Sequence, residues 1–146
     1  MNNGKICVSV CAKTADELIE QIKRAEDLAD VIEIRFDCLD KAEFNCLDLE
    51  NSGKVLSKVL NQDYKKTVLQ TFRSREQGGH QDLSKEERDI FWNGGFDKDW
   101  ADCEEDIIQD SFHWLWDKRI CSYHDFEKVP ENLVEIYKRL NATHTD

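Results

Sequence analysis

Residues 31–37 read Val31-Ile32-Glu33-Ile34-Arg35-Phe36-Asp37, and this stretch decides the fold. Its alternation of apolar and charged side chains predicts a strand over residues 30–37, because successive side chains of a strand point to opposite faces. The apolar side chains share one face, and Glu33, Arg35 and Asp37 share the other. A parallel sheet that helices cover on both faces would be apolar on both. The charged face therefore favours a barrel, whose upper interior can hold a polar site.

The rest of the chain repeats the order strand, then helix. Short apolar runs predict further strands at residues 5–11, 66–73, 100–104 and 119–124. Capping boxes at 14–17 and 84–87 predict the starts of two helices. Apolar spacing predicts further helices over 54–60, over 107–116 and from Pro130 onward. Residues 44–52 are interpreted as a polar connection. This order implies a parallel sheet with right-handed crossovers. It fits an open doubly wound sheet or part of a (β/α)8 barrel, in one domain over residues 1–146.

Composition limits the partners of the chain. The formal net charge of the 146 residues is -11, and such a surface repels nucleic acid and anionic membranes. The early apolar run at 6–10 is too short for the core of a signal peptide or for a membrane span. None of the six cysteines forms a C-x-x-C pair. We therefore predict a cytoplasmic protein with reduced thiols.

Polar residues of the other predicted strands also share one parity, and each lies near a strand end. They are Ser9, Thr71, Arg73, Asp102, Glu104, Ser122 and His124. Arg35 and Arg73 suit an anionic substrate, because guanidinium groups bind carboxylates with forked hydrogen bonds. His124 can exchange protons near neutral pH. Glu33 and Asp102 would orient the arginines or the imidazole, and the alternative is a buried ion network without catalysis.

The motifs resemble those of one enzyme family. In chain order they are residues 6–9 (ICVS), 31–37 (VIEIRFD), 71–73 (TFR) with Gly78-Gly79, 102–104 (DCE) and 122–126 (SYHDF). Together they resemble the type I 3-dehydroquinate dehydratases of the shikimate pathway, which serves aromatic amino acid biosynthesis. The resemblance implies a (β/α)8 TIM barrel. It also implies a hydro-lyase that converts 3-dehydroquinate to 3-dehydroshikimate through a Schiff base, without metal or added cofactor.

The resemblance also implies roles for individual residues. His124 would be the catalytic proton shuttle, Ser9, Glu33, Arg35 and Arg73 would bind substrate, and Asp102 and Glu104 would support the site from beneath. Gln77 departs from the family, which usually has glutamate immediately before the glycine pair. The Gln77 side chain can hydrogen-bond the imidazole, but it does not raise the basicity of the imidazole as a carboxylate does.

A second departure concerns the lysine that forms the Schiff base. The family carries this lysine on the sixth strand, and the sequence ends at Asp146 after about five βα units, so the C-terminal units are missing. Lys138 lies on a predicted helix and is no substitute. Five strands do not close a barrel. We therefore expect little or no turnover from this chain, and a homodimer or a missing C-terminal segment against its open edges.

Two other interpretations stay open at this point. One is a metal-dependent barrel enzyme with Asp102, Glu104 and His124 as ligands. The other is a non-catalytic truncated relative that binds an anionic ligand or a partner chain. Three aromatic residues, Phe112, Trp114 and Trp116, are interpreted as packing residues rather than a ligand platform.

Overall fold

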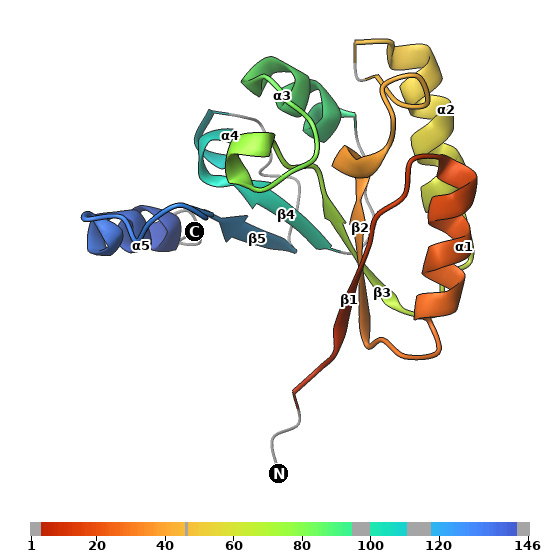
Figure 1. Ribbon diagram of the computed structural model, residues 1–146, viewed down its shortest axis with the longest axis horizontal. Coiled ribbons are helices and arrows are strands. Elements are labelled where there is room, and N and C mark those ends of the chain that lie inside the picture. Colours follow the sequence, from red (N-terminus) through yellow and green to blue (C-terminus); the bar gives the residue numbers. More distant parts are fainter. Residues whose placement is uncertain (1–3, 46, 95–99, 111–117, 143–146) are drawn as a thin grey trace.

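The computed structural model describes residues 4–45, 47–94, 100–110 and 118–142 of the chain. Its centre is one parallel sheet of five strands, seen in Figure 1: β1 Cys7–Val10, β2 Val31–Arg35, β3 Thr67–Thr71, β4 Trp100–Glu104 and β5 Arg119–Ser122. Each strand pairs with the one before it in the sequence, in the order β1-β2-β3-β4-β5. A doubly wound sheet reverses its strand order at a switch point. This sheet does not, so the barrel-type arrangement is confirmed.

Helices connect the strands. They are α1 Ala15–Ala25, α2 Leu49–Leu60, α3 Lys85–Asn93, α4 Glu105–Asp110 and α5 Leu133–Ala142, with short 3-10 turns η1 Phe36–Cys38 and η2 Arg75–Gln77. In Figure 1, α1 and α2 lie to the right of the sheet, α3 and α4 lie above it, and α5 lies at the far left, beyond β5. Both reciprocal hydrogen bonds of the predicted capping box between Ser84 and Glu87 are present. Thr14 also caps α1, by accepting from the backbone N–H of Glu17.

Two helix starts differ from the sequence prediction. Helix α2 begins at Leu49 instead of residue 54, because the Asp48 side chain accepts from the Asn51 N–H and caps the helix inside the predicted polar connection. Helix α5 begins at Leu133 instead of Pro130, because the carbonyl of Asn132 accepts the first helical N–H, from Ile136. The predicted helix after β4 is described only to Asp110, and the aromatic residues 112, 114 and 116 lie outside the described residues.

The two faces of the sheet differ as the alternation predicts. The face that packs against the helices is buried and mostly apolar, and it carries Val10, Ile32, Ile34, Val68, Ala101 and Cys103. Helix α1 places Leu18 and Ile22 against this face, and each fully buried side chain of this size stabilises the fold by about 1.5–3 kcal/mol. On the opposite face, Trp100 and Ile120 are each 39% exposed. That face corresponds to the interior of the barrel, which five strands leave open.

The cysteines do not all stay reduced. Cys11, just after β1, and Cys38, in η1, form a disulfide across 27 positions of the sequence, so the prediction of reduced thiols is wrong for this pair. Cys103 keeps its thiol, and burial raises the pKa of this thiol far above its ordinary value, which makes it a poor nucleophile. Among the described helices, none is long and apolar enough to cross a membrane.

Candidate anion-binding and proton-transfer site

The predicted polar residues meet at the carboxyl ends of β2 to β5. Strand register places Arg35 beside Thr71 and Thr71 beside Asp102, so their side chains share the open face of the sheet. The Thr71 hydroxyl donates to the Glu33 carboxylate at 2.8 Å. Ser9 lies level with Glu33 on the edge strand β1, where it is exposed. The alternation within each strand therefore builds one polar surface from separate segments of the chain.

Arg35 is held by a buried carboxylate. Its Nε and Nη2 atoms donate to the two oxygens of Asp37 at 2.9 and 2.8 Å, and Nη2 also donates to the carbonyl of Gly78 at 3.3 Å. Asp37 is fully buried, lies in η1 just past β2, and also accepts the backbone N–H of His80 at 3.1 Å. This forked pair raises the pKa of Arg35, which therefore stays cationic with a fixed orientation.

Arg73 is the second cation of the site, and it is buried. Its Nη2 atom donates to Asp102 and, at 3.5 Å, to the Ser122 hydroxyl of β5. Arg73 Nε and Asp102 Oδ1 are buried and make no hydrogen bond to the described residues. Buried polar atoms are nearly always paired in folded proteins. These two atoms therefore make the Arg73–Asp102 pair the least completely satisfied polar contact of the site.

His124 completes the group just past β5. Desolvation lowers the pKa of its imidazole, and the positive charges of Arg73 and Arg35 lower it further, against the opposing charges of Asp102 and Glu33. These groups therefore lie within electrostatic reach of His124. Its Nδ1 atom is buried and also lacks a hydrogen-bond partner among the described residues. A neutral imidazole with a free ring nitrogen can accept a proton from a ligand at pH 7.

Gln77 holds His124 differently from the sequence prediction. Its side-chain oxygen accepts the backbone N–H of His124 at 2.8 Å, so Gln77 fixes the strand end rather than the imidazole ring. Next to it, the ring of Phe126 lies over Gly78 so closely that a Cβ atom there would overlap it. Gly78 has φ +84°, a conformation that favours glycine. The glycine pair therefore lets the loop after η2 approach the end of β5.

Glu104 belongs to a neighbouring network. It accepts from the backbone N–H and the hydroxyl of Ser74 and pairs with Arg88 of α3, which also binds Asp106 at 2.7–2.9 Å. Glu104 therefore supports the strand ends rather than facing Arg73. Sequence reasoning missed Arg88. Its position three and four residues before the buried Phe91 and Trp92 places it on the inner face of α3, and this signal would have found it.

The metal interpretation of this region is wrong. Among the described residues, the ligand atoms of Asp102, Glu104 and His124 do not come together closely enough to share an ion. Arg88 neutralises Glu104 instead, and Arg73 neutralises Asp102.

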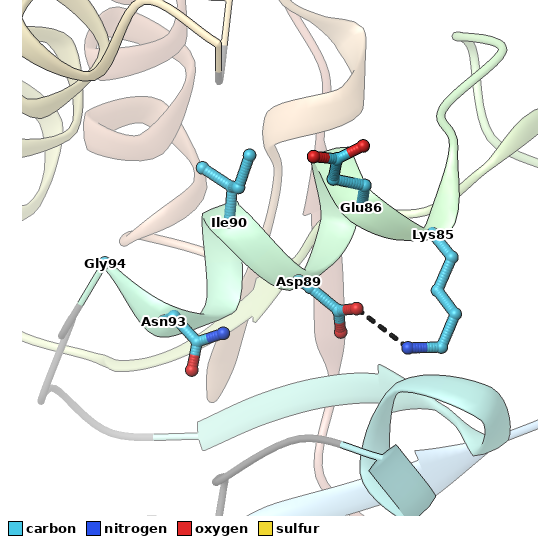
Figure 2. A pocket seen from close by; sticks show the side chains of 6 residues that line it. All are labelled: Lys85, Glu86, Asp89, Ile90, Asn93 and Gly94. Atoms are coloured by element: carbon cyan, nitrogen blue, oxygen red, sulfur yellow. Dashed lines mark hydrogen bonds and ion pairs between the residues drawn. The ribbon is translucent and has the colours of Figure 1, made fainter.

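A well-formed cavity lies elsewhere, on α3. It has a volume of about 620 Å³ along the outer side of α3, and Figure 2 shows its six lining residues, among them Ile90 and the ion pair of Lys85 with Asp89. None of the predicted site residues lines it. Its lining residues come from a single helix and its end and include no convergent set of reactive groups, so the strand ends remain the candidate site.

A titration tests the electrostatics of the site. We expect His124 to titrate below the ordinary histidine pKa of about 6.5. We expect Arg73→Met to raise this pKa, because the substitution removes a cation and leaves Asp102 unopposed. NMR of the imidazole protons measures both values, with His124→Gln to assign the resonance and Lys54→Met, an exposed cation on α2, as the control that leaves it unchanged.

The lowered pKa of His124 also predicts how the stability of the protein changes with pH. Between the lowered pKa of His124 and its ordinary value, the unfolded chain binds more protons than the folded one, so stability falls as the pH drops through this window. His124→Gln is expected to remove this part of the acid sensitivity. An unshifted wild-type pKa, or a pKa that Arg73→Met leaves in place, would contradict the geometry.

Comparisons with known proteins all point to one enzyme family. The family model described as type I 3-dehydroquinase matches residues 6–146. The 3-dehydroquinate dehydratase of Methanothermobacter thermautotrophicus is 34% identical over 133 residues, which cover 88% of this chain and 56% of that protein. The 3-dehydroquinate dehydratase of Streptococcus sanguinis is 30% identical over 144 residues, which cover 94% and 60%.

Solved structures show the same fold. The 3-dehydroquinate dehydratase of Enterococcus faecalis superposes with a TM-score of 0.75 at 22% identity, over 99% of this chain and 64% of that one. The type I enzyme of Clostridium difficile, solved with covalently modified comenic acid, gives 0.72 at 26% identity, over 97% and 60%. The chain therefore has the α/β fold of these TIM-barrel-type enzymes and spans about three fifths of their length.

Proposed function

Because the chain belongs to the type I 3-dehydroquinase family, we propose that it supplies the substrate-binding and proton-transfer part of a 3-dehydroquinate dehydratase, a hydro-lyase of the shikimate pathway. The observation that carries this proposal is the group of two oriented guanidinium groups, Arg35 and Arg73, beside the imidazole of His124 at the strand ends. They supply two cations and one proton acceptor. This set matches a ligand that carries a carboxylate, hydroxyl groups and a proton to be removed.

His124 acts as the base of the proposed reaction. An imine formed at the substrate ketone withdraws electrons and acidifies the adjacent carbon, and a neutral imidazole removes the proton from it. Burial and the two arginines hold His124 in the neutral form at pH 7. The same imidazole, once protonated, returns the proton to the departing hydroxyl, so that water leaves and a conjugated double bond remains.

The arginines bind the anionic end of the substrate. Asp37 and Asp102 each occupy part of one guanidinium group and fix its plane. The remaining N–H groups of each guanidinium are directed by this pairing rather than free to rotate. Glu33, oriented by Thr71, and Ser9 at the edge contribute polar contacts to substrate hydroxyls. Asp102, Glu104 and Gln77 act as supporting residues.

The imine step separates the two candidate functions. The resemblance places the Schiff-base lysine on a sixth strand, whereas Lys138 is an exposed residue of helix α5. The alternative is a non-catalytic relative that binds the anion through Arg35 and Arg73 without turnover. The pairing of Arg35 with Asp37 and of Arg73 with Asp102 supports this alternative as well, because binding an anion requires oriented arginines but no lysine.

One experiment distinguishes these functions. The protein is mixed with 3-dehydroquinate, and the conjugated product is followed by its ultraviolet absorbance, with and without borohydride, which reduces an imine to a stable amine. Turnover with a covalent mass increase supports the dehydratase. Binding without an adduct, weakened in Arg73→Met but not in Lys54→Met, supports the alternative. If the wild-type protein neither binds nor converts the substrate, both functions are excluded for this chain.

We also propose that another polypeptide surface covers the β5 and α5 end, in a cytoplasmic protein. Large apolar side chains are exposed there: Ile120, Phe126, Val129, Leu133, Val134 and Tyr137. Only Ile136 of α5 is buried, and Arg139 ties the helix to Glu105 of α4. An apolar area of this kind usually marks an interface. Its partner is either a second copy, in a homodimer, or a C-terminal segment that completes the barrel.

A further inference from the structure

Two sulfur atoms and an imidazole meet beside the site but outside it. Cys11 follows β1, Cys38 lies in η1 after β2, and His80 follows the glycine pair. Their ligand atoms all lie within 4.8 Å of one another, and Cys11 Sγ is 3.8 Å from His80 Nε2. The proposed dehydratase chemistry uses none of the three. Among the described residues, these three side chains form a group whose ligand atoms lie close enough together to hold a metal ion.

One distance is close to that of a tetrahedral metal centre, and the two sulfur atoms, which the disulfide joins, can reach such a spacing only after reduction. Zinc binds thiolate sulfur at about 2.3 Å and imidazole nitrogen at about 2.0–2.1 Å, so a sulfur and a nitrogen ligand lie about 3.5–3.6 Å apart. The distance of 3.8 Å between Cys11 Sγ and His80 Nε2 is slightly longer than this. Sulfur and imidazole ligands select zinc-like cations over magnesium or calcium, which prefer oxygen.

The three ligand segments are held together by more than the disulfide. Asp37 accepts the backbone N–H of His80, and the N–H of Asp40 donates to the carbonyl of Lys13 at 2.9 Å. The side chain of Gln81 donates to the carbonyl of Leu39. The segment after β2 is therefore tied to the segments after β1 and η2 by hydrogen bonds that do not involve sulfur, and reduction of the disulfide leaves these ties in place.

An ion can enter this cluster from solvent. Cys11 and His80 are exposed, whereas Cys38 is buried. A cavity of about 360 Å³, lined in part by Cys38, His80, Lys13 and Asp40, lies beside the ligands. It leaves room for water as a fourth ligand.

We propose that Cys11, Cys38 and His80 form a redox-controlled site for a zinc-like divalent cation. In the oxidised chain, the disulfide closes the site. A phosphine reductant transfers two electrons to the disulfide and takes up the oxygen of water, which leaves two thiols. The cation then binds two thiolates and the imidazole and releases two protons. A small-molecule disulfide then exchanges with the two thiolates, takes their two electrons and two protons from water to become two thiols, and restores the Cys11–Cys38 disulfide as the ion leaves.

Cobalt(II) is the probe for the test, because it takes zinc sites and reports its ligands by colour. The full chain is titrated with Co²⁺ after phosphine reduction and again after oxidation. Reduced protein is expected to bind one Co²⁺ per chain, with a sulfur-to-cobalt charge-transfer band and the visible bands of tetrahedral Co²⁺, and Zn²⁺ is expected to displace it. Oxidised protein is expected to show neither band.

Variants locate the ion. Cys38→Ser is expected to weaken binding at least 100-fold, and His80→Ala to shift the visible bands and weaken binding. Cys7→Ser, an exposed free cysteine on β1, is the matched control and keeps the wild-type spectrum. Circular dichroism shows whether each variant is folded. Equal binding by oxidised protein, no binding by reduced protein, or an unchanged spectrum in a folded Cys11→Ser, Cys38→Ser double variant would overturn the proposal.

Discussion

Arg88→Ala is expected to lower the free energy of unfolding by about 3–5 kcal/mol, because it leaves a carboxylate buried without its cation. Glu104 is only 2% exposed, and Arg88 is its cationic partner, bridging it to Asp106. Burial raises the pKa of Glu104, and the charge of Arg88 counteracts this rise. Urea unfolding at pH 7 measures the loss.

The pH dependence distinguishes this cause from lost packing. Without Arg88, the pKa of Glu104 rises further, and the folded variant takes up a proton that the unfolded chain does not hold. Stability of the variant then falls as the pH rises through the window between the ordinary and the raised pKa of Glu104. The deficit relative to wild type is therefore largest at neutral pH and smaller at pH values below the ordinary carboxyl pKa.

Two further variants act as controls. Arg75→Ala removes an ion pair with Asp82 whose side chains are 62% and 81% exposed, and it is expected to cost less than about 1 kcal/mol. Arg88→Met with Glu104→Gln removes both charges and keeps an acceptor for Ser74, so it is expected to be more stable than Arg88→Ala. Equal losses in Arg88→Ala and Arg75→Ala would contradict the buried-charge explanation.

The sheet was predictable because its signal is local and repeated. The alternation in residues 31–37 places the apolar side chains against the helices and the charged ones on the open face, and this separation is what the structure shows. The capping box at Ser84 was predictable for the same reason, since both of its hydrogen bonds join residues three positions apart. Helix α2 was predicted too short because four successive residues near its start, Glu50 to Gly53, are polar or glycine and so give no apolar spacing.

The contacts that sequence reasoning missed join residues far apart in the chain. Arg88 meets Glu104 across 16 positions, and Cys11 meets Cys38 across 27. Parity placed Asp102 and Glu104 on one face, yet Asp102 pairs with Arg73 and Glu104 with α3. Alternation fixes the face of a side chain but not its partner. The partner of a side chain depends on how closely a neighbouring loop approaches the strand. In this protein, the loop after η2 approaches the end of β3 closely because residue 79 is a glycine.

Gly79→Ala is expected to destabilise the protein by about 3 kcal/mol, at the upper end of the range for overpacked sites. A Cβ atom at this position would overlap the backbone carbonyl of Arg73 and lie 2.7 Å from the carbonyl oxygen of Ser74. Backbone atoms cannot rotate away as a side chain does. The loop must shift, which breaks the 2.8 Å hydrogen bond from Gly79 N–H to Ser74 and pulls His80 from Asp37.

Gly53→Ala is the matched control with the opposite sign. Gly53 lies inside α2, where an added Cβ atom would meet no neighbouring atom within 4 Å, so alanine is expected to stabilise the helix by about 0.5–1 kcal/mol. Urea midpoints compare the two variants, and the pKa of His124 reports the site. Since Asp37 orients Arg35, Gly79→Ala should also change that pKa, whereas Gly53→Ala should not. If Gly79→Ala instead leaves stability unchanged or raises it, as Gly53→Ala is expected to do, the loop tolerates a side chain and its close approach to Arg73 does not hold the site together.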